Sequence, residues 1–176
     1  MPSTSAVSLH RWRIGECEES GEVDWSMELF PEDSIREFVE WKAANPTHFT
    51  WWNYLNVKSD LQTALAFARF YYPEIIETEG YFLLKDKFNL EVFKGWKSEC
   101  NNDKRSVEKM MNLYEVKDFF HININPNEDL IGQTRWLSEV LQLFWSMSFV
   151  HRYPGRRINV HIFDDKGSRF ITVYEE

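Results

Sequence analysis

The stretch that most constrains the fold is residues 61–72, LQTALAFARFYY, which is apolar on nearly every side of a helix. Ser59 lies where an N-cap is expected, Asp60 falls in the first turn, where the helix dipole favours a carboxylate, and Pro73 ends the helix. An apolar surface all round is typical of a buried helix. Such a helix is not stable alone, so we expect the other elements to cover it.

A second aromatic cluster lies directly upstream, in residues 49–55. Its residue types favour a strand, but a helix starting at Thr47 fits equally well, so its class stays open. Neighbouring rings cannot all point the same way on either element, so one of Trp51 and Trp52 is a candidate for exposure. An exposed tryptophan would suit a protein interface or a stacked ligand.

The rest of the chain alternates between helical and strand patterns. Patterns of short strands cover residues 10–14, 23–30 and 120–124, and hairpins cover 75–84 and 158–174. Helical patterns begin near Pro31, Asn89, Asp103 and Asn127. We therefore predict an α+β fold: a mostly antiparallel sheet with a C-terminal β-hairpin, packed against two apolar helices (61–72 and 127–150), plus smaller helices.

Length and composition indicate one domain. The 176 residues, 43% hydrophobic and 27% charged, suit one globular domain at 10–176 after a flexible N-terminus at 1–9.

No apolar run reaches eighteen residues, and the first residues do not resemble a secretion signal, so we expect no membrane partner. Cys17 and Cys100 have no metal or redox spacing. They suit reduced thiols, which predicts a cytoplasmic protein.

Negative charge is concentrated in residues 15–40, which hold ten acidic residues and one basic residue, Arg36. Because the whole chain carries −8, the remainder is close to neutral. Such a segment repels phosphate backbones, which argues against nucleic acid, and attracts a partner protein with a basic surface. The candidate contacts are Glu18, Glu19, Glu22 and Asp24. A role in solubility alone is the competing interpretation.

Linear signatures of catalysis are missing from the sequence. It contains no dinucleotide-binding glycine pattern, Walker A loop, HExxH, EF-hand or nucleophile elbow. We therefore assign no catalytic residue, no metal and no cofactor. Many active sites have no linear signature, so this pattern leaves an enzyme open.

One alternative pocket can be assembled from separate parts of the chain. His121 and His161 lie on the polar sides of two expected strands, and neighbouring strands would bring the two rings together. Glu74 and Glu77, with Glu79, could supply paired carboxylates. Ordinary sheet histidines and a solvated hairpin tip explain the same residues.

Two functional hypotheses follow. The first is a non-catalytic, intracellular protein-binding module, an adaptor or a neutraliser of the immunity or antitoxin type, that presents the acidic segment to a basic partner. The alternative is a small enzyme or ligand-binding protein with a pocket of histidine and glutamate between sheet and helices. The sequence does not determine the oligomeric state.

Overall fold

The computed structural model describes residues 29–123 and 129–176. Its helices are α1 (Arg36–Ala44), α2 (Trp51–Lys58), α3 (Leu61–Tyr71), α4 (Leu90–Glu99), α5 (Lys104–Met111) and α6 (Leu130–Arg152). Its strands are β1 (Ile75–Thr78), β2 (Tyr81–Leu84), β3 (Tyr114–Glu115), β4 (Ile158–Asp165) and β5 (Ser168–Glu175). Short 3-10 helices cover Glu32–Ser34, Lys85–Lys87 and Val116–Asn123. The predicted α+β class is confirmed.

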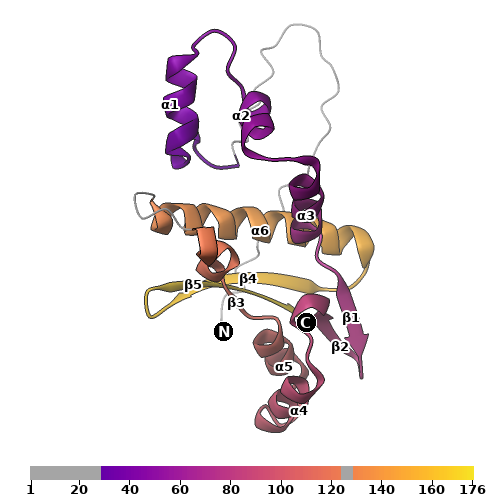
Figure 1. Cartoon of the computed structure of the whole chain (residues 1–176). Coiled ribbons are helices and arrows are strands. Elements are labelled where there is room, and N and C mark those ends of the chain that lie inside the picture. Colours follow the sequence, from indigo (N-terminus) through magenta and orange to yellow (C-terminus); the bar gives the residue numbers. More distant parts are fainter. Residues whose placement is uncertain (1–28, 124–128) are drawn as a thin grey trace, which may run out of the picture.

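Two small antiparallel sheets lie side by side beneath α6 (Figure 1). One is the hairpin β1–β2, with Glu77 opposite Phe82, and the other has the order β3–β5–β4. The C-terminal hairpin pairs β4 with β5 from Ile158 opposite Glu175 to Asp165 opposite Ser168. Both hairpins predicted from the sequence are confirmed. Glycine suits the turns of both hairpins, because Gly80 and Gly167 have φ values of +81° and +82°, which glycine adopts without strain.

The main core lies between α6 and the two sheets. Leu141, Trp145 and Phe149 come from one side of α6, as the helical period requires, and all are almost fully buried. They pack on buried residues of β2, β4 and β5, namely Phe82, Leu84, Val160, Ile171 and Val173. A second cluster joins the other face of β2 to α4 and α5 through Tyr81, Leu83, Phe93, Val107 and Met111.

Helix starts follow the capping residues. The Asn89 side chain accepts hydrogen bonds from two backbone N–H groups of α4, and Asp103 accepts one from Ser106 of α5. The caps of α3 and α6 are Asp60 and Asp129, one or two residues from the expected Ser59 and Asn127. These four helices lie where the sequence predicts them.

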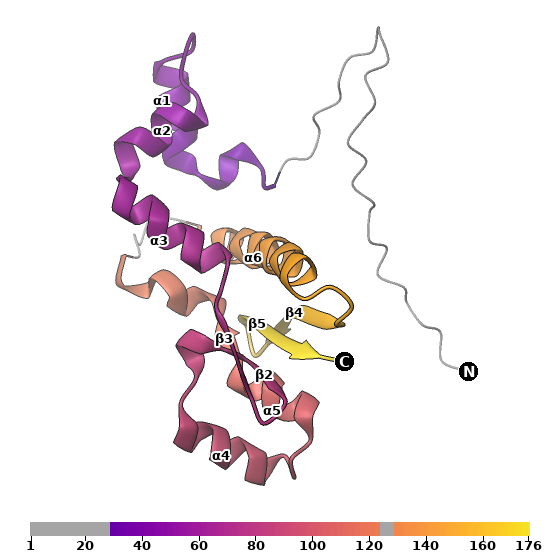
Figure 2. The ribbon, with the colours of Figure 1, turned by 90° about the vertical axis from the view of Figure 1, so that its right-hand side faces the viewer.

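Helices α1 and α2 form an aromatic pair that stands apart from the sheets, with α3 connecting it to the rest of the chain (Figures 1 and 2). The buried Phe38 ring stacks on Trp51 at a centroid distance of 3.6 Å. Phe49 and Tyr54 also contact Phe38. The cluster whose class was open is therefore a helix, capped by Thr50, whose N–H donates to Asn53 Oδ1.

The prediction that residues 61–72 form a buried helix is half wrong. The segment is helical, but α3 contains no buried residue. The described residues cover mainly its C-terminal half: Tyr71 packs on Phe144 of α6, and Trp145 Nε1 donates to the Phe70 carbonyl at 2.9 Å. An apolar pattern shows that a helix needs cover and does not show which molecule provides it.

The prediction of a strand at 120–124 is wrong for the residues that the structure describes, because Val116–Asn123 is a 3-10 helix. Phe119 and Phe120 both contact the Phe70 ring, at 5.0 and 5.5 Å. Successive side chains of a strand point to opposite faces and could not share that contact. The strand expected at 10–14 lies outside the described residues, as does the strand expected at 23–30 except for Leu29 and Phe30, which are not in a strand.

Candidate interaction surface

Five large apolar side chains of α2 and α3 are exposed, and all but Val57 form two pairs, one along each helix. Trp52 and Leu55 share one side of α2, with exposed fractions of 75% and 54%, and Leu61 and Leu65 share one side of α3, with 84% and 70%. We call these four residues the α2–α3 surface. Exposed apolar residues are ordinary one at a time, but two leucines with Ala64 and Ala68 along one helix side are a concentration typical of interfaces.

The two candidate tryptophans have different surroundings. Trp51 is half-buried on Phe38 and also contacts Phe30 and Tyr54. Trp52 points away from this cluster and is mostly exposed. The rotation of about 100° per residue in a helix separates the two rings. Of the pair, Trp52 is therefore the residue available to a binding partner.

The described part of the acidic segment is largely neutralised within the chain. Glu32 pairs with Lys42 at 2.5 Å, Glu37 with Lys58 at 2.7 Å, and Glu40 with Arg36 at 2.8 Å. The Lys58 ammonium lowers the pKa of the Glu37 carboxyl through its hydrogen bond. Residues 15–28 hold the other six acidic residues of the segment and no basic residue. Glu18, Glu19, Glu22 and Asp24 lie outside the described residues.

A cleft of about 2050 Å³ separates α1 from the N-terminal half of α6 and the β4–β5 turn. Its walls include Arg36 and Glu40 of α1, Arg135 and Glu139 of α6, and Arg169. Charges of both signs alternate, and Glu139 lies near both Arg135 and Arg169. The cleft therefore has no strong preference for an anion or a cation.

The histidines of the alternative pocket do not line this cleft. His121 is in the 3-10 helix and its Nδ1 contacts the Asp118 carbonyl at 2.7 Å. His161 lies on β4 and stacks on Phe163. The two rings were expected to meet because both histidines were placed on neighbouring strands. His121 lies in a 3-10 helix, so that expectation no longer has a basis.

The two candidate carboxylates are used in ion pairs with the chain's own cations. Glu74 binds Arg69 and Lys85, and Glu77 accepts from Arg156 at 2.8 Å.

Among the residues that the structure describes, no three histidine, cysteine or acidic side chains are grouped as metal ligands would be. Nor is any described helix long and apolar enough to cross a membrane.

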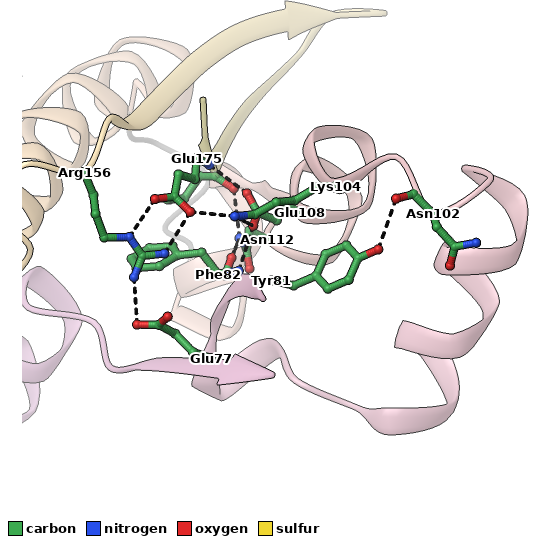
Figure 3. A network of polar contacts seen from close by, with 10 residues as sticks. Glu77, Tyr81, Phe82, Asn102, Lys104, Glu108, Asn112, Arg156 and Glu175 are labelled. Carbon is green, nitrogen blue, oxygen red and sulfur yellow. Dashed lines mark hydrogen bonds and ion pairs between the residues drawn. The ribbon is translucent and has the colours of Figure 1, made fainter. Parts of the chain in front are cut away.

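A buried polar network joins the two sheets through α5 (Figure 3). Glu108 on α5 and Asn112, which caps the C-terminus of that helix, lie one turn apart, and both are fully buried. The Glu108 carboxylate accepts from the N–H groups of Phe82 and Glu175, each at 2.7 Å. The Asn112 side chain accepts from the Leu84 N–H and donates to the carbonyls of Phe82 and Val173. These two side chains thus satisfy the facing edges of β2 and β5.

Arg156 extends this network to the surface. It donates to both oxygens of Glu175 and to Glu77, and Lys104 reaches Glu175 at 2.6 Å. The hydrogen bonds from Arg156 lower the pKa of Glu175 to about 2, whereas burial raises the pKa of Glu108. Every charge here has a partner in the chain, so we assign the network to stability.

Neither the family models nor the curated proteins nor the solved structures compared with this chain contain a match.

Proposed function

We propose that the chain is a non-catalytic protein-binding module whose α2–α3 surface docks on a partner protein that has an apolar groove bordered by basic residues. One observation carries the proposal: α3, an almost wholly apolar helix, has no buried residue. Burying one leucine or tryptophan side chain in a partner contributes roughly 1.5–3 kcal/mol. The four residues of the surface therefore supply enough apolar area for the centre of an interface.

The negative charge of the chain supports a partner with a basic surface. The chain carries −8, and residues 1–28 hold six of its acidic residues against Arg11 and Arg13. This segment precedes α1 and continues into the helical pair that presents Trp52. A partner with lysines and arginines around its groove would be attracted at long range and held by apolar contacts at short range.

A pocket enzyme has less support. Its histidines lie away from the cleft wall, and its glutamates are occupied by Arg69, Lys85 and Arg156. An apolar helix side that no described residue covers is explained directly by docking and not by catalysis.

Site-specific crosslinking tests the proposal. A photoreactive amino acid at position 65 should crosslink in lysate to one protein with a basic surface. The same group at Lys94, which is exposed on α4, should not capture it. Leu61→Asp with Leu65→Asp should abolish capture, and replacing Glu18, Glu19, Glu22 and Asp24 by lysine should weaken it at low salt only, because salt screens charge.

Three outcomes would contradict this function. They are equal capture from positions 65 and 94, undiminished capture by the double aspartate variant, and a captured partner that is acidic. Circular dichroism of each variant must match that of the parent chain, so that lost capture reports the surface and not unfolding.

A further inference from the structure

Strand β4 has one unpaired edge. It is the outer strand in the order β3–β5–β4, and within residues 29–123 and 129–176 no strand pairs with its other side. In Figure 2 this edge points away from α3 and β2. At eight residues β4 is twice as long as β1, the outer strand of the neighbouring hairpin. Long free edges are templates for pairing with another strand.

The ladder identifies which groups lie on this edge. The Glu176 N–H donates to the Arg157 carbonyl at 2.9 Å, so odd-numbered residues of β4 bond toward β5. The N–H and carbonyl groups of Ile158, Val160, Ile162 and Asp164 therefore point outward. Gln142 fits this parity, because its amide donates to the outward Val160 carbonyl at 2.9 Å.

The facing edges of β2 and β5 are closed by side chains, whereas the outer edge of β4 is open over most of its length. Glu108 and Asn112 saturate the facing edges of β2 and β5. Along β4, residues 158–163 read INVHIF, with no proline, lysine or acidic residue to discourage pairing. The geometry favours an extended strand as the occupant, because it alone offers matching N–H and carbonyl groups at every second residue.

We propose that a second copy of this chain supplies that strand and that two β4 strands pair antiparallel about a twofold axis at His161. Outward groups must face outward groups, so Val160 bonds with Ile162 of the second copy and Ile158 with its Asp164. The pairing joins the two three-stranded sheets into one of six strands. The axis makes each contact occur twice.

Charge complementarity selects this register. With the axis at His161, Arg157 faces Asp165 of the second copy, which gives two opposite-charge pairs at the ends of the ladder. An axis at Val160 would place Arg157 opposite Phe163, and an axis at Ile162 would place Asn159 opposite Asp165. Of these three registers, only the one centred on His161 places the charged ends, Arg157 and Asp165, opposite each other.

The existing contacts allow the pairing. A carbonyl oxygen has two lone pairs, so Val160 can accept from Gln142 and from the second copy together. His161 is exposed, and the two His161 rings would meet at a non-hydrogen-bonded position, where facing side chains are closest. Asn159 would face the half-buried Phe163 of the second copy.

Sedimentation equilibrium of the full chain tests the dimer. The expected mass is about 42 kDa, twice the 21.2 kDa of one chain, at protein concentrations of tens of micromolar. Ile162→Pro should give a monomer with an unchanged circular dichroism spectrum, because its N–H is outside the β5 ladder. His161→Lys, which places two cations on the axis, should also give a monomer.

A charge exchange tests the register. Arg157→Glu and Asp165→Lys should each weaken dimerisation about tenfold, since each breaks two symmetry-related pairs, and the double variant should restore it. Leu61→Asp with Leu65→Asp should leave the dimer intact, which separates this interface from the α2–α3 surface.

The inference is overturned if the parent chain is monomeric at 200 µM, or if Ile162→Pro and His161→Lys both remain dimeric. It is also overturned if only the Leu61 and Leu65 variant dissociates, because α3 would then form the contact. A double charge variant that stays monomeric would exclude the His161-centred register.

Discussion

Arg156 holds Glu175 by two parallel hydrogen bonds, from Nε to Oε1 at 2.6 Å and from Nη2 to Oε2 at 2.9 Å. Its third hydrogen bond, to Glu77, joins the loop after α6 and the end of β5 to β1 of the other sheet. The guanidinium also lies over the Phe82 ring, 4.9 Å from its centroid. One side chain therefore connects three segments that are far apart in the sequence.

We predict that Arg156→Ala lowers the free energy of unfolding by about 3 kcal/mol, because two largely buried carboxylate bonds and the ring contact are lost together. Urea unfolding followed by circular dichroism measures the change. Lys94→Ala is the matched control, since its ion pair with Glu91 is exposed and should contribute less than about 0.5 kcal/mol. Equal effects of the two substitutions would mean that the Arg156 network contributes no more to stability than an exposed ion pair does.

Acid should unfold the chain through Glu175. Its pKa of about 2 in the folded chain lies below the ordinary value of 4.5, so its stabilisation is complete above about pH 4.5 and is lost as pH falls toward 2. Glu175→Gln should flatten the dependence of the melting temperature on pH in that window. A variant that melts with the same pH slope as the parent chain would assign acid sensitivity to other groups.

Asn112 should be intolerant of even an isosteric change. In Asn112→Asp the new carboxylate still accepts from the Leu84 N–H, but it cannot donate to the carbonyls of Phe82 and Val173. Two buried acceptors then lack a donor and the buried charge lacks a counter-ion, so we expect a loss of about 3–5 kcal/mol or no folding. Asn101→Asp, on an exposed turn, should change stability little. A mild effect at Asn112 would imply that water enters the gap.

Much of the fold follows from local patterns in the sequence. The hairpins, the caps at Asn89 and Asp103 and the stripe of α6 are all local, because each depends on residues a few positions apart. The assignment of residues 120–124 failed because alternation over five residues is also compatible with a short helix whose rings face α3. Tertiary contacts of Phe119 and Phe120 determine that choice.

The candidate surface was harder to predict. The sequence shows that one of Trp51 and Trp52 can face outward, and the Phe38 stack determines that it is Trp52. The sequence also shows that residues 61–72 are apolar. Whether Leu61 is exposed depends on which other elements pack against it in the fold. Glu108 and Asn112 carry no local signal, because their role arises from two strand edges brought together by the fold.

Glu108 tests whether a buried carboxylate can be replaced by its amide. Each of its oxygens accepts from one backbone N–H, so in Glu108→Gln the new NH₂ group must face a buried donor. We expect a loss of about 1–3 kcal/mol even though the charge penalty disappears. Burial raises the pKa of Glu108, so this penalty grows as pH rises above 4.5, and the deficit of the variant should shrink at higher pH. Glu91→Gln on exposed α4 is the control.

The α1–α2 pair should open before the main core. Its centre is the stack of Phe38 on Trp51, and the pair lies apart from the sheets (Figure 1). Removing the Phe38 ring leaves a cavity among Phe49, Trp51 and Tyr54, which typically costs about 3–5 kcal/mol. We therefore expect Phe38→Ala to accelerate amide hydrogen exchange across residues 36–58 while exchange at 141–149 and 171–173 is unchanged. Faster exchange in the core as well would show that the pair and the core unfold as one unit.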